Sequence, residues 1–227
     1  DQAANILSKA GHLMFMDTAT GEYELIPPSP AMPEYEVVVV YSGISTALIS
    51  TDYNNRVDEC KVSAWILQEL AYREVASFKE ANLRQVDYES YLKFRAELPE
   101  RFQKRADHFF SENERVKKGV AAWKKGDLNS FGQLMFASGA SSIENYQCGC
   151  PELITIYNLL RETPGVYGAR FSGAGYRGCC IGLIDPEYKD TIKARIAAEY
   201  PLKHPEYKEV YQVNFCKTDD GARIIHL

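Results

Sequence analysis

The chain has 227 residues, about one and a half times a typical domain of roughly 150 residues. Hydrophobic residues make up 45% and charged residues 25%, which is typical of a folded protein and excludes a disordered chain. The 26 Lys and Arg against 31 Asp and Glu give a net charge of −5 with no strongly basic half, which disfavours nucleic acid as a partner. No apolar run approaches the roughly 20 residues that span a bilayer, and no signal-peptide pattern opens the chain. We therefore predict a cytoplasmic protein without a membrane partner.

The first part of the sequence predicts a short helix, a hairpin and a strand. Gly11 suits a helix stop, and the proline-rich segment 27–33 cannot continue a strand, so it predicts a linker or crossover. The β-branched run Val37 to Val40 is typical of a strand buried on both faces. The expected helix end and strands fall at 1–10, 12–17, 23–26 and 35–41.

The middle of the chain is helical by its apolar spacing. Apolar side chains recur three or four positions apart after Asn55 and again after Pro99, a residue that sits well at a helix start. Gly126 ends the second pattern, and two shorter helices are expected beyond it. These helices fall at about 55–71, 99–125, 131–136 and 151–160. We interpret their apolar stripes as packing faces.

The last third alternates between strands and one helix. Asp185 as N-cap and Pro186 in the first turn predict a helix that runs to about Glu199. Helices and strands mixed in this way predict an α+β fold with an antiparallel or mixed sheet. The expected strands fall at 168–171, 179–184 and 209–214.

The six cysteines do not form a recognisable metal-binding or disulfide pattern. Cys148-Gly149-Cys150 lacks the C-x-x-C spacing of zinc ribbons, and no pair of histidines stands at metal-ligand spacing. The chain is neither short nor visibly secreted, so reduced and mostly buried thiols are expected, and no metal site.

The segment Gly173-Ala174-Gly175-Tyr176-Arg177-Gly178 matches G-x-G-x-x-G. A dinucleotide-binding fingerprint needs a helix after this loop, but the residues at 179–184 favour a strand, so that interpretation fails. Two others stay open. The loop is a tight hairpin whose glycines only supply positive φ, or its small residues let backbone N–H groups approach an anion, with Arg177 as charge partner.

Several segments, in order along the chain, resemble the GHMP small-molecule kinases in their galactokinase form. The segment 169–179, around the glycine loop, resembles the third conserved motif of that family. Arg177 stands where galactokinases usually have Gly, and Ser138 to Tyr146 looks closer to galacturonokinase, so the sugar stays open. The other matching segments are Tyr-x-x-Arg-x-x-x-Cys at 53–60, R-x-x-H-x-x-x-E-x-x-R-V at 105–116, Cys-Pro-Glu-Leu at 150–153 and Asp-Gln at 1–2.

The resemblance implies a GHMP kinase C-terminal domain: an α+β fold with a ferredoxin-like mixed or antiparallel sheet and several long helices on one face. That domain is expected at 35–227, with 1–34 a remnant of the N-terminal or inter-domain region. The family's N-terminal half, which supplies the ATP phosphate loop and the Mg²⁺ ligands, would lie outside this chain. The chain opens with Asp rather than Met, which predicts processing or excision from something longer. Self-association through the exposed inter-half surface is then expected.

The function implied is that of an ATP-dependent sugar 1-kinase, whose partners are ATP and a small sugar and whose cofactor is Mg²⁺. The γ-phosphate would pass to the anomeric hydroxyl of galactose or a related sugar, with Asp1 as the catalytic carboxylate. Tyr53 and Arg177 would bind substrate. The phosphate or glycine loop would comprise Ser172, Gly173, Ala174, Gly175 and Gly178. A galacturonokinase-type enzyme and a non-catalytic sugar-binding or regulatory relative are the alternatives.

Residue chemistry alone also offers plainer interpretations of the same positions. Asp1 reads as an exposed terminal acid, Tyr53 as a half-buried tyrosine and Arg177 as half of a surface ion pair. His108 and Glu112 stand four residues apart, a spacing that suits a metal pair, but a helix-surface hydrogen bond or ion pair is favoured. Ser138, Ser141 and Ser142 are predicted as turn and N-cap residues ahead of a helix, without a catalytic role.

Overall fold

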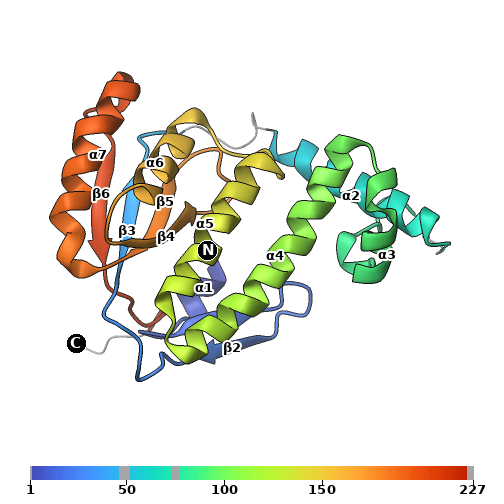
Figure 1. Ribbon diagram of the computed structural model, residues 1–227, viewed down its shortest axis with the longest axis horizontal. Coiled ribbons are helices and arrows are strands. Elements are labelled where there is room, and N and C mark those ends of the chain that lie inside the picture. Colours follow the sequence, from blue (N-terminus) through green and yellow to red (C-terminus); the bar gives the residue numbers. More distant parts are fainter. Residues whose placement is uncertain (1, 46–51, 73–76, 224–227) are drawn as a thin grey trace.

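The computed structural model describes residues 2–45, 52–72 and 77–223. Its helices and strands follow one another along the chain as Figure 1 shows. The helices are α1 (Gln2–Leu7), α2 (Tyr53–Leu70), α3 (Tyr88–Phe94), α4 (Glu100–Lys125), α5 (Leu128–Glu144), α6 (Pro151–Arg161) and α7 (Lys189–Lys203). The strands are β1 (Leu13–Met16), β2 (Tyr23–Ile26), β3 (Glu36–Tyr41), β4 (Val166–Phe171), β5 (Cys179–Ile184) and β6 (Gln212–Cys216).

Four strands form an antiparallel sheet in the order β4-β5-β3-β6. Taken along the chain, β3, the helices, β4, β5, α7 and β6 give the β-α-β-β-α-β arrangement of a ferredoxin-like fold, with α2 to α6 inserted in the first crossover. The hairpin β1-β2 is a separate two-stranded sheet. The predicted α+β class with an antiparallel sheet is therefore confirmed.

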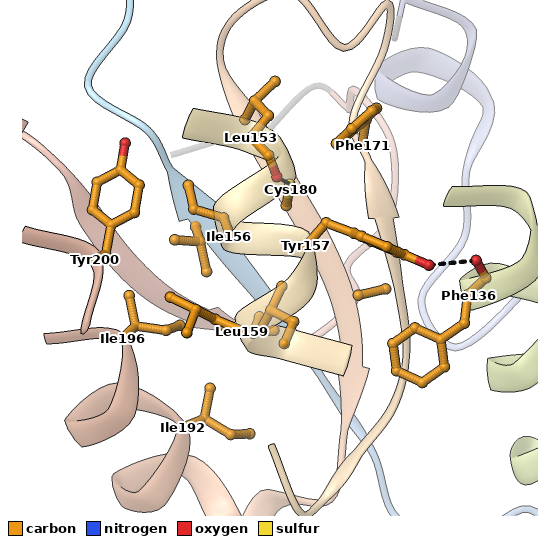
Figure 2. Packing of buried hydrophobic residues seen from close by; sticks show 14 of the residues in the cluster. Phe136, Leu153, Ile156, Tyr157, Leu159, Phe171, Cys180, Ile192, Ile196 and Tyr200 are labelled. Carbon is orange, nitrogen blue, oxygen red and sulfur yellow. Dashed lines mark hydrogen bonds between the residues drawn. The ribbon is translucent and has the colours of Figure 1, made fainter. Parts of the chain in front are cut away.

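The largest core lies between the sheet and the helices α6 and α7. Tyr157 on α6 is buried, and its hydroxyl donates to the backbone carbonyl of Phe136 on α5 at 2.7 Å (Figure 2). Ile192, Ile196 and Tyr200 of α7 are fully buried in the same core, where α7 packs beside α6. Several helices thus cover one face of the sheet, as predicted (Figure 1).

The valine run of β3 alternates between two environments instead of being buried on both faces. Val38 and Val40 are fully buried in the main core, whereas Val37 and Val39 are half-buried. Val37 packs toward a second, smaller core. That second core is made of Ile26 from the hairpin together with Trp123, Leu128 and Leu183. The segment 1–34 therefore shares a core with the sheet domain, and a boundary at residue 34 stays a prediction.

The prediction for the serines after residue 136 is wrong. We expected a short helix at 131–136 and then a turn, but α5 runs unbroken to Glu144, and Ser138, Ser141 and Ser142 are buried within it. The Ser142 hydroxyl donates to the Ser138 carbonyl one turn earlier at 2.9 Å, which satisfies it inside the helix. Small residues were read as turn formers because sequence alone does not show that this helix must pack closely on its neighbours.

Other boundaries differ in smaller ways. The helix α3 was not predicted, and β6 begins at Gln212 rather than at 209. Within α4, Val116 is exposed, whereas Phe110 is buried. Gly126 ends α4 in the left-handed conformation with φ 76°, as predicted. Across the described ranges, none of the helices combines the length and the apolar character that crossing a membrane requires.

Candidate functional site

The glycine loop is the turn between β4 and β5, so the predicted strand–loop–strand context is present. Gly173, Gly175 and Gly178 have φ values of 80°, 79° and 87°, a region that side chains rarely adopt. The Ser172 N–H donates to the Cys179 carbonyl at 2.9 Å and closes the base of the loop. Backbone conformation alone thus requires glycine at these three positions.

The three glycines differ in what surrounds them. At Gly175 a Cβ would lie 2.7 Å from the ring of Phe171, and its carbonyl accepts from the Cys150 N–H at 3.0 Å. At Gly173 and Gly178 a Cβ would meet no heavy atom within 4 Å. Gly175 therefore anchors the loop to the body of the domain, while the other two glycines border open space. An open backbone is what an approaching anion needs.

Two side chains of the loop have no polar partner among the residues that the structure describes. The Arg177 side chain is half-buried, and it forms no ion pair or hydrogen bond with any residue in the described ranges. The Tyr176 hydroxyl is buried and likewise finds no hydrogen-bond partner there. Burial raises the pKa of Tyr176, against a lowering effect from the positive charge of Arg56. The surface ion pair considered for Arg177 is not formed within the described ranges.

Tyr53 is the first residue of α2 and is 43% exposed. Burial raises the pKa of Tyr146, and the neighbouring groups that add to this shift include Tyr53 and Tyr176. Tyr53 and Tyr176 therefore both lie near Tyr146. The start of α2 and the glycine loop therefore meet at the same end of the molecule. Asp1 lies outside the described residues, so its expected place beside this loop stays a prediction.

His108 and Glu112 of α4 face α5 and are not on an open helix surface. His108 Nδ1 lies 3.0 Å from the Ser141 hydroxyl, and Glu112 accepts from the Ser138 hydroxyl at 2.7 Å and from Arg115 Nε at 2.6 Å. Burial lowers the pKa of His108 to about 4, partly opposed by the charge of Glu112. Burial acts to raise the pKa of Glu112, but the hydrogen bonds from Ser138 and Arg115 prevail and lower it. The hydrogen-bonded interpretation of this pair is the one that the geometry supports.

The cysteines of the described chain are all free thiols. Cys148 and Cys180 are buried, and Cys216 is exposed. Burial raises the pKa of Cys60, Cys148 and Cys150 to about 11, so these groups carry a proton at neutral pH.

Sequence reasoning missed two groupings that join distant parts of the chain. Glu152, His204 and Glu206 bring ligand-type atoms within 4.8 Å of one another, although His204 is engaged by the Thr155 hydroxyl at 2.9 Å. Behind the glycine loop lies a buried charged cluster of Arg56, Glu59 and Arg105. These arginines stand in the motifs at 53–60 and 105–116, so the signal was present, but no role was given to them.

Comparisons with known proteins identify the family and the fold of this chain. A family model described as "GHMP kinases C terminal" matches residues 120–202. Galacturonokinase from Arabidopsis thaliana is 40% identical over 230 residues, which covers 99% of this chain and 54% of that protein. Galactokinase from Roseiflexus sp. (strain RS-1) is 31% identical over 222 residues, 98% of this chain and 54% of that protein. The crystal structure of Lactococcus lactis galactokinase complexed with galactose matches with a TM-score of 0.81 and 26% identity, over 97% of this chain and 54% of that one.

The fold and the matched segment together define a GHMP kinase C-terminal domain. Within that class, this chain is homologous to the C-terminal half of galactokinases and of a galacturonokinase. It spans about half the length of the curated relatives that it matches.

Proposed function

We propose that this chain is the C-terminal part of an ATP-dependent sugar kinase, which transfers the γ-phosphate of ATP to the anomeric hydroxyl of galactose, galacturonate or a close relative. The observation that carries the proposal is the 40% identity with a galacturonokinase over 99% of the chain. The open backbone of the glycine loop supports it independently, because such a loop accommodates an anionic group.

Phosphoryl transfer depends mainly on positioning and on stabilising charge, and the residues of this chain have roles of that kind. Asp1 would accept the proton of the anomeric hydroxyl or orient that hydroxyl. Tyr53 would hydrogen-bond the sugar, and the backbone of Ser172 to Gly175 would face an anionic group. ATP supplies the phosphoryl group, and ATP and Mg²⁺ would be held mainly by the family's N-terminal half.

A uronic acid is the substrate that the loop favours. The Arg177 guanidinium stands half-buried in the loop with no partner in the described ranges. A planar guanidinium binds a carboxylate through two parallel hydrogen bonds, which a neutral hydroxymethyl group cannot match. The higher identity to a galacturonokinase than to the Roseiflexus galactokinase points in the same direction.

The test is a sugar panel on the full-length protein with ATP, measured as sugar-dependent ADP release. Galactose, galacturonate, arabinose and glucuronate are compared. We expect the uronic acids to be preferred, and Arg177→Gly to lower kcat/KM for galacturonate about 10- to 100-fold, because a hydrogen bond to a charged group contributes about 1.5–3 kcal/mol. Turnover of galactose by the same variant is the internal control. No sugar-dependent ADP release contradicts the kinase proposal, and unchanged galacturonate kinetics assign Arg177 to structure.

Three further proposals follow from membership in this class. We propose that residues 35–227 form the GHMP domain and that 1–34 belong to the region that joins it to the N-terminal half. We also propose that the protein is located in the cytoplasm. The surface that would meet that half is expected to drive self-association of the chain on its own, which light scattering at increasing protein concentration would detect.

A further inference from the structure

Arg105 is the largest fully buried side chain in the described residues, with 1% of its side chain exposed. Its guanidinium on α4 uses three nitrogens. Nε donates to Glu59 Oε2 on α2 at 2.6 Å, Nη1 donates to the Asn145 carbonyl at 2.5 Å, and Nη2 donates to Gln147 Oε1 at 2.9 Å. One side chain thus joins two helices and the segment that follows α5.

Arg56 on α2 contacts two of the same residues, Glu59 and Gln147. Its Nη1 lies 3.2 and 3.1 Å from the two carboxylate oxygens of Glu59, and its Nε donates to the Gln147 carbonyl at 3.2 Å. Gln147 has a φ of 55°, a left-handed conformation that disfavours any residue other than glycine. Such a conformation persists where the surroundings fix it, and here two arginines do so.

The segment held in this way is the wall behind the glycine loop. Three residues beyond Gln147, the Cys150 N–H donates to the carbonyl of Gly175. A Cβ at Gly175 would lie 3.3 Å from Cys148 Sγ, so the loop rests directly on this segment. At the other end of the network, Arg56 is one helical turn after Tyr53. The network is therefore linked to Tyr53 through the first turn of α2 and to the glycine loop through the segment 148–150.

From this geometry we infer that Arg105 is a positioning residue for the sugar site. It fixes the start of α2, which carries Tyr53, relative to the segment 145–150, which is hydrogen-bonded to the glycine loop at Gly175. A buried ion pair contributes little stability compared with apolar side chains of the same volume. The planar guanidinium of Arg105 instead fixes the relative positions of its partners, because its three directed hydrogen bonds can be made together in one arrangement only. The inference rests on the proposed function for its consequence in catalysis.

Arg105→Lys separates geometry from charge, since lysine keeps the positive charge that attracts Glu59 but loses the planar guanidinium that bonds three partners at once. The matched control is Arg95→Lys, which breaks a bidentate pair with Asp107 on the side of α4 that faces α3. In the full-length protein, Arg105→Lys is expected to raise KM for the sugar about tenfold and to change KM for ATP less than twofold. Arg95→Lys is expected to leave both values within twofold. An equal loss of kcat in the two variants without a change in KM would overturn the inference.

A second measurement does not depend on catalysis. Hydrogen exchange of the Cys150 amide, which is bonded to Gly175, is expected to become at least about tenfold faster in Arg105→Lys and to stay unchanged in Arg95→Lys. Gln147→Asn, which tolerates positive φ but has a shorter side chain, is expected to act in the same direction if Arg105→Lys does not fold. Unchanged exchange at Cys150 in a folded variant would refute the positioning role. Absent sugar kinase activity in the wild type would refute only the proposed function.

Discussion

At the scale of single residues, buried polar groups set how this domain responds to pH. His108 is packed between α4 and α5, and burial lowers its pKa to about 4, while Arg115 and Arg170 act in the same direction and Glu112 opposes them. An unfolded histidine has a pKa near 6.5. Between these two values the unfolded chain binds a proton that the folded chain does not, so falling pH favours unfolding.

We therefore predict that the free energy of unfolding attributable to His108 is fully present above pH 6.5 and falls by roughly 2–3 kcal/mol as pH drops toward 4, since one pKa unit corresponds to about 1.4 kcal/mol. Urea denaturation at pH 4.5, 5.5 and 7.5 measures it. His108→Gln should flatten this dependence, with His12→Gln as the control for losing an imidazole elsewhere. An equally steep dependence in His108→Gln would show that other groups cause it.

Single residues also show which parts of the candidate site could be predicted from the sequence and which could not. Tyr53 and Arg177 could be singled out from motifs, and the structure places both at one end of the domain. The role of Arg105 could not be foreseen, because its partner Glu59 is 46 positions away and nothing in a sequence says that an arginine will be 1% exposed. A charged residue is normally read as a solvated one. The place of Asp1 stays a prediction.

At the scale of elements, α5 and β4 approach each other closely. Gly132 of α5 and Gly168 of β4 face each other backbone to backbone, and a Cβ at Gly132 would lie 2.0 Å from the Tyr167 carbonyl oxygen. Because backbone cannot move aside as a flexible side chain can, any larger residue must separate the helix from the sheet.

Gly132→Ala is therefore predicted to lower the free energy of unfolding by about 3 kcal/mol, the upper range for overpacking a core. Gly119→Ala on α4 is the matched control, since its Cβ would lie 3.5 Å from Phe131, an ordinary contact. That control should gain up to about 1 kcal/mol from the better helix propensity of alanine. Chemical denaturation of both variants measures the difference. Gly132→Ala within about 0.5 kcal/mol of wild type would show that α5 can shift.

This contact explains why element boundaries were harder to predict than element types. The apolar periodicities of α2 and α4 and the valine run of β3 correctly indicated helix and strand. Ser138, Ser141 and Ser142 of α5 are predicted as turn and N-cap residues because the intrinsic helix propensity of serine is low. The helix continues through them, and its glycines allow it to approach its neighbours closely, since a Cβ at Gly132 would lie 2.0 Å from the Tyr167 carbonyl oxygen and one at Gly139 would lie 2.4 Å from the ring of Tyr157. In α5, tertiary packing outweighs the low intrinsic helix propensity of these residues, and such packing cannot be seen directly in a sequence.

At the scale of the whole molecule, the N-terminal segment is tied to the rest of the domain through its hairpin and through its first helix. Ile26 is 1% exposed against Trp123, Leu128 and Leu183. Near the other end of the chain, the Gly221 N–H donates to the Ser8 carbonyl at 2.7 Å and the Ala222 N–H donates to the Asn5 carbonyl at 2.8 Å. The helix α1, which follows directly on Asp1, is thus held by residues more than 200 positions away.

The last prediction concerns the 227 residues assayed alone. The glycine loop and Tyr53 are proposed to form one side of a sugar site, and the resemblance assigns the ATP phosphate loop and the Mg²⁺ ligands to the family's N-terminal half. Phosphoryl transfer depends on holding donor and acceptor together. The 227 residues alone should therefore give no sugar-dependent ADP release above the rate measured in buffer without protein. A coupled assay with galactose and galacturonate measures this, and the full-length protein is the positive control. Turnover by these residues alone would mean that they bind ATP themselves and would move the proposed nucleotide site into this domain.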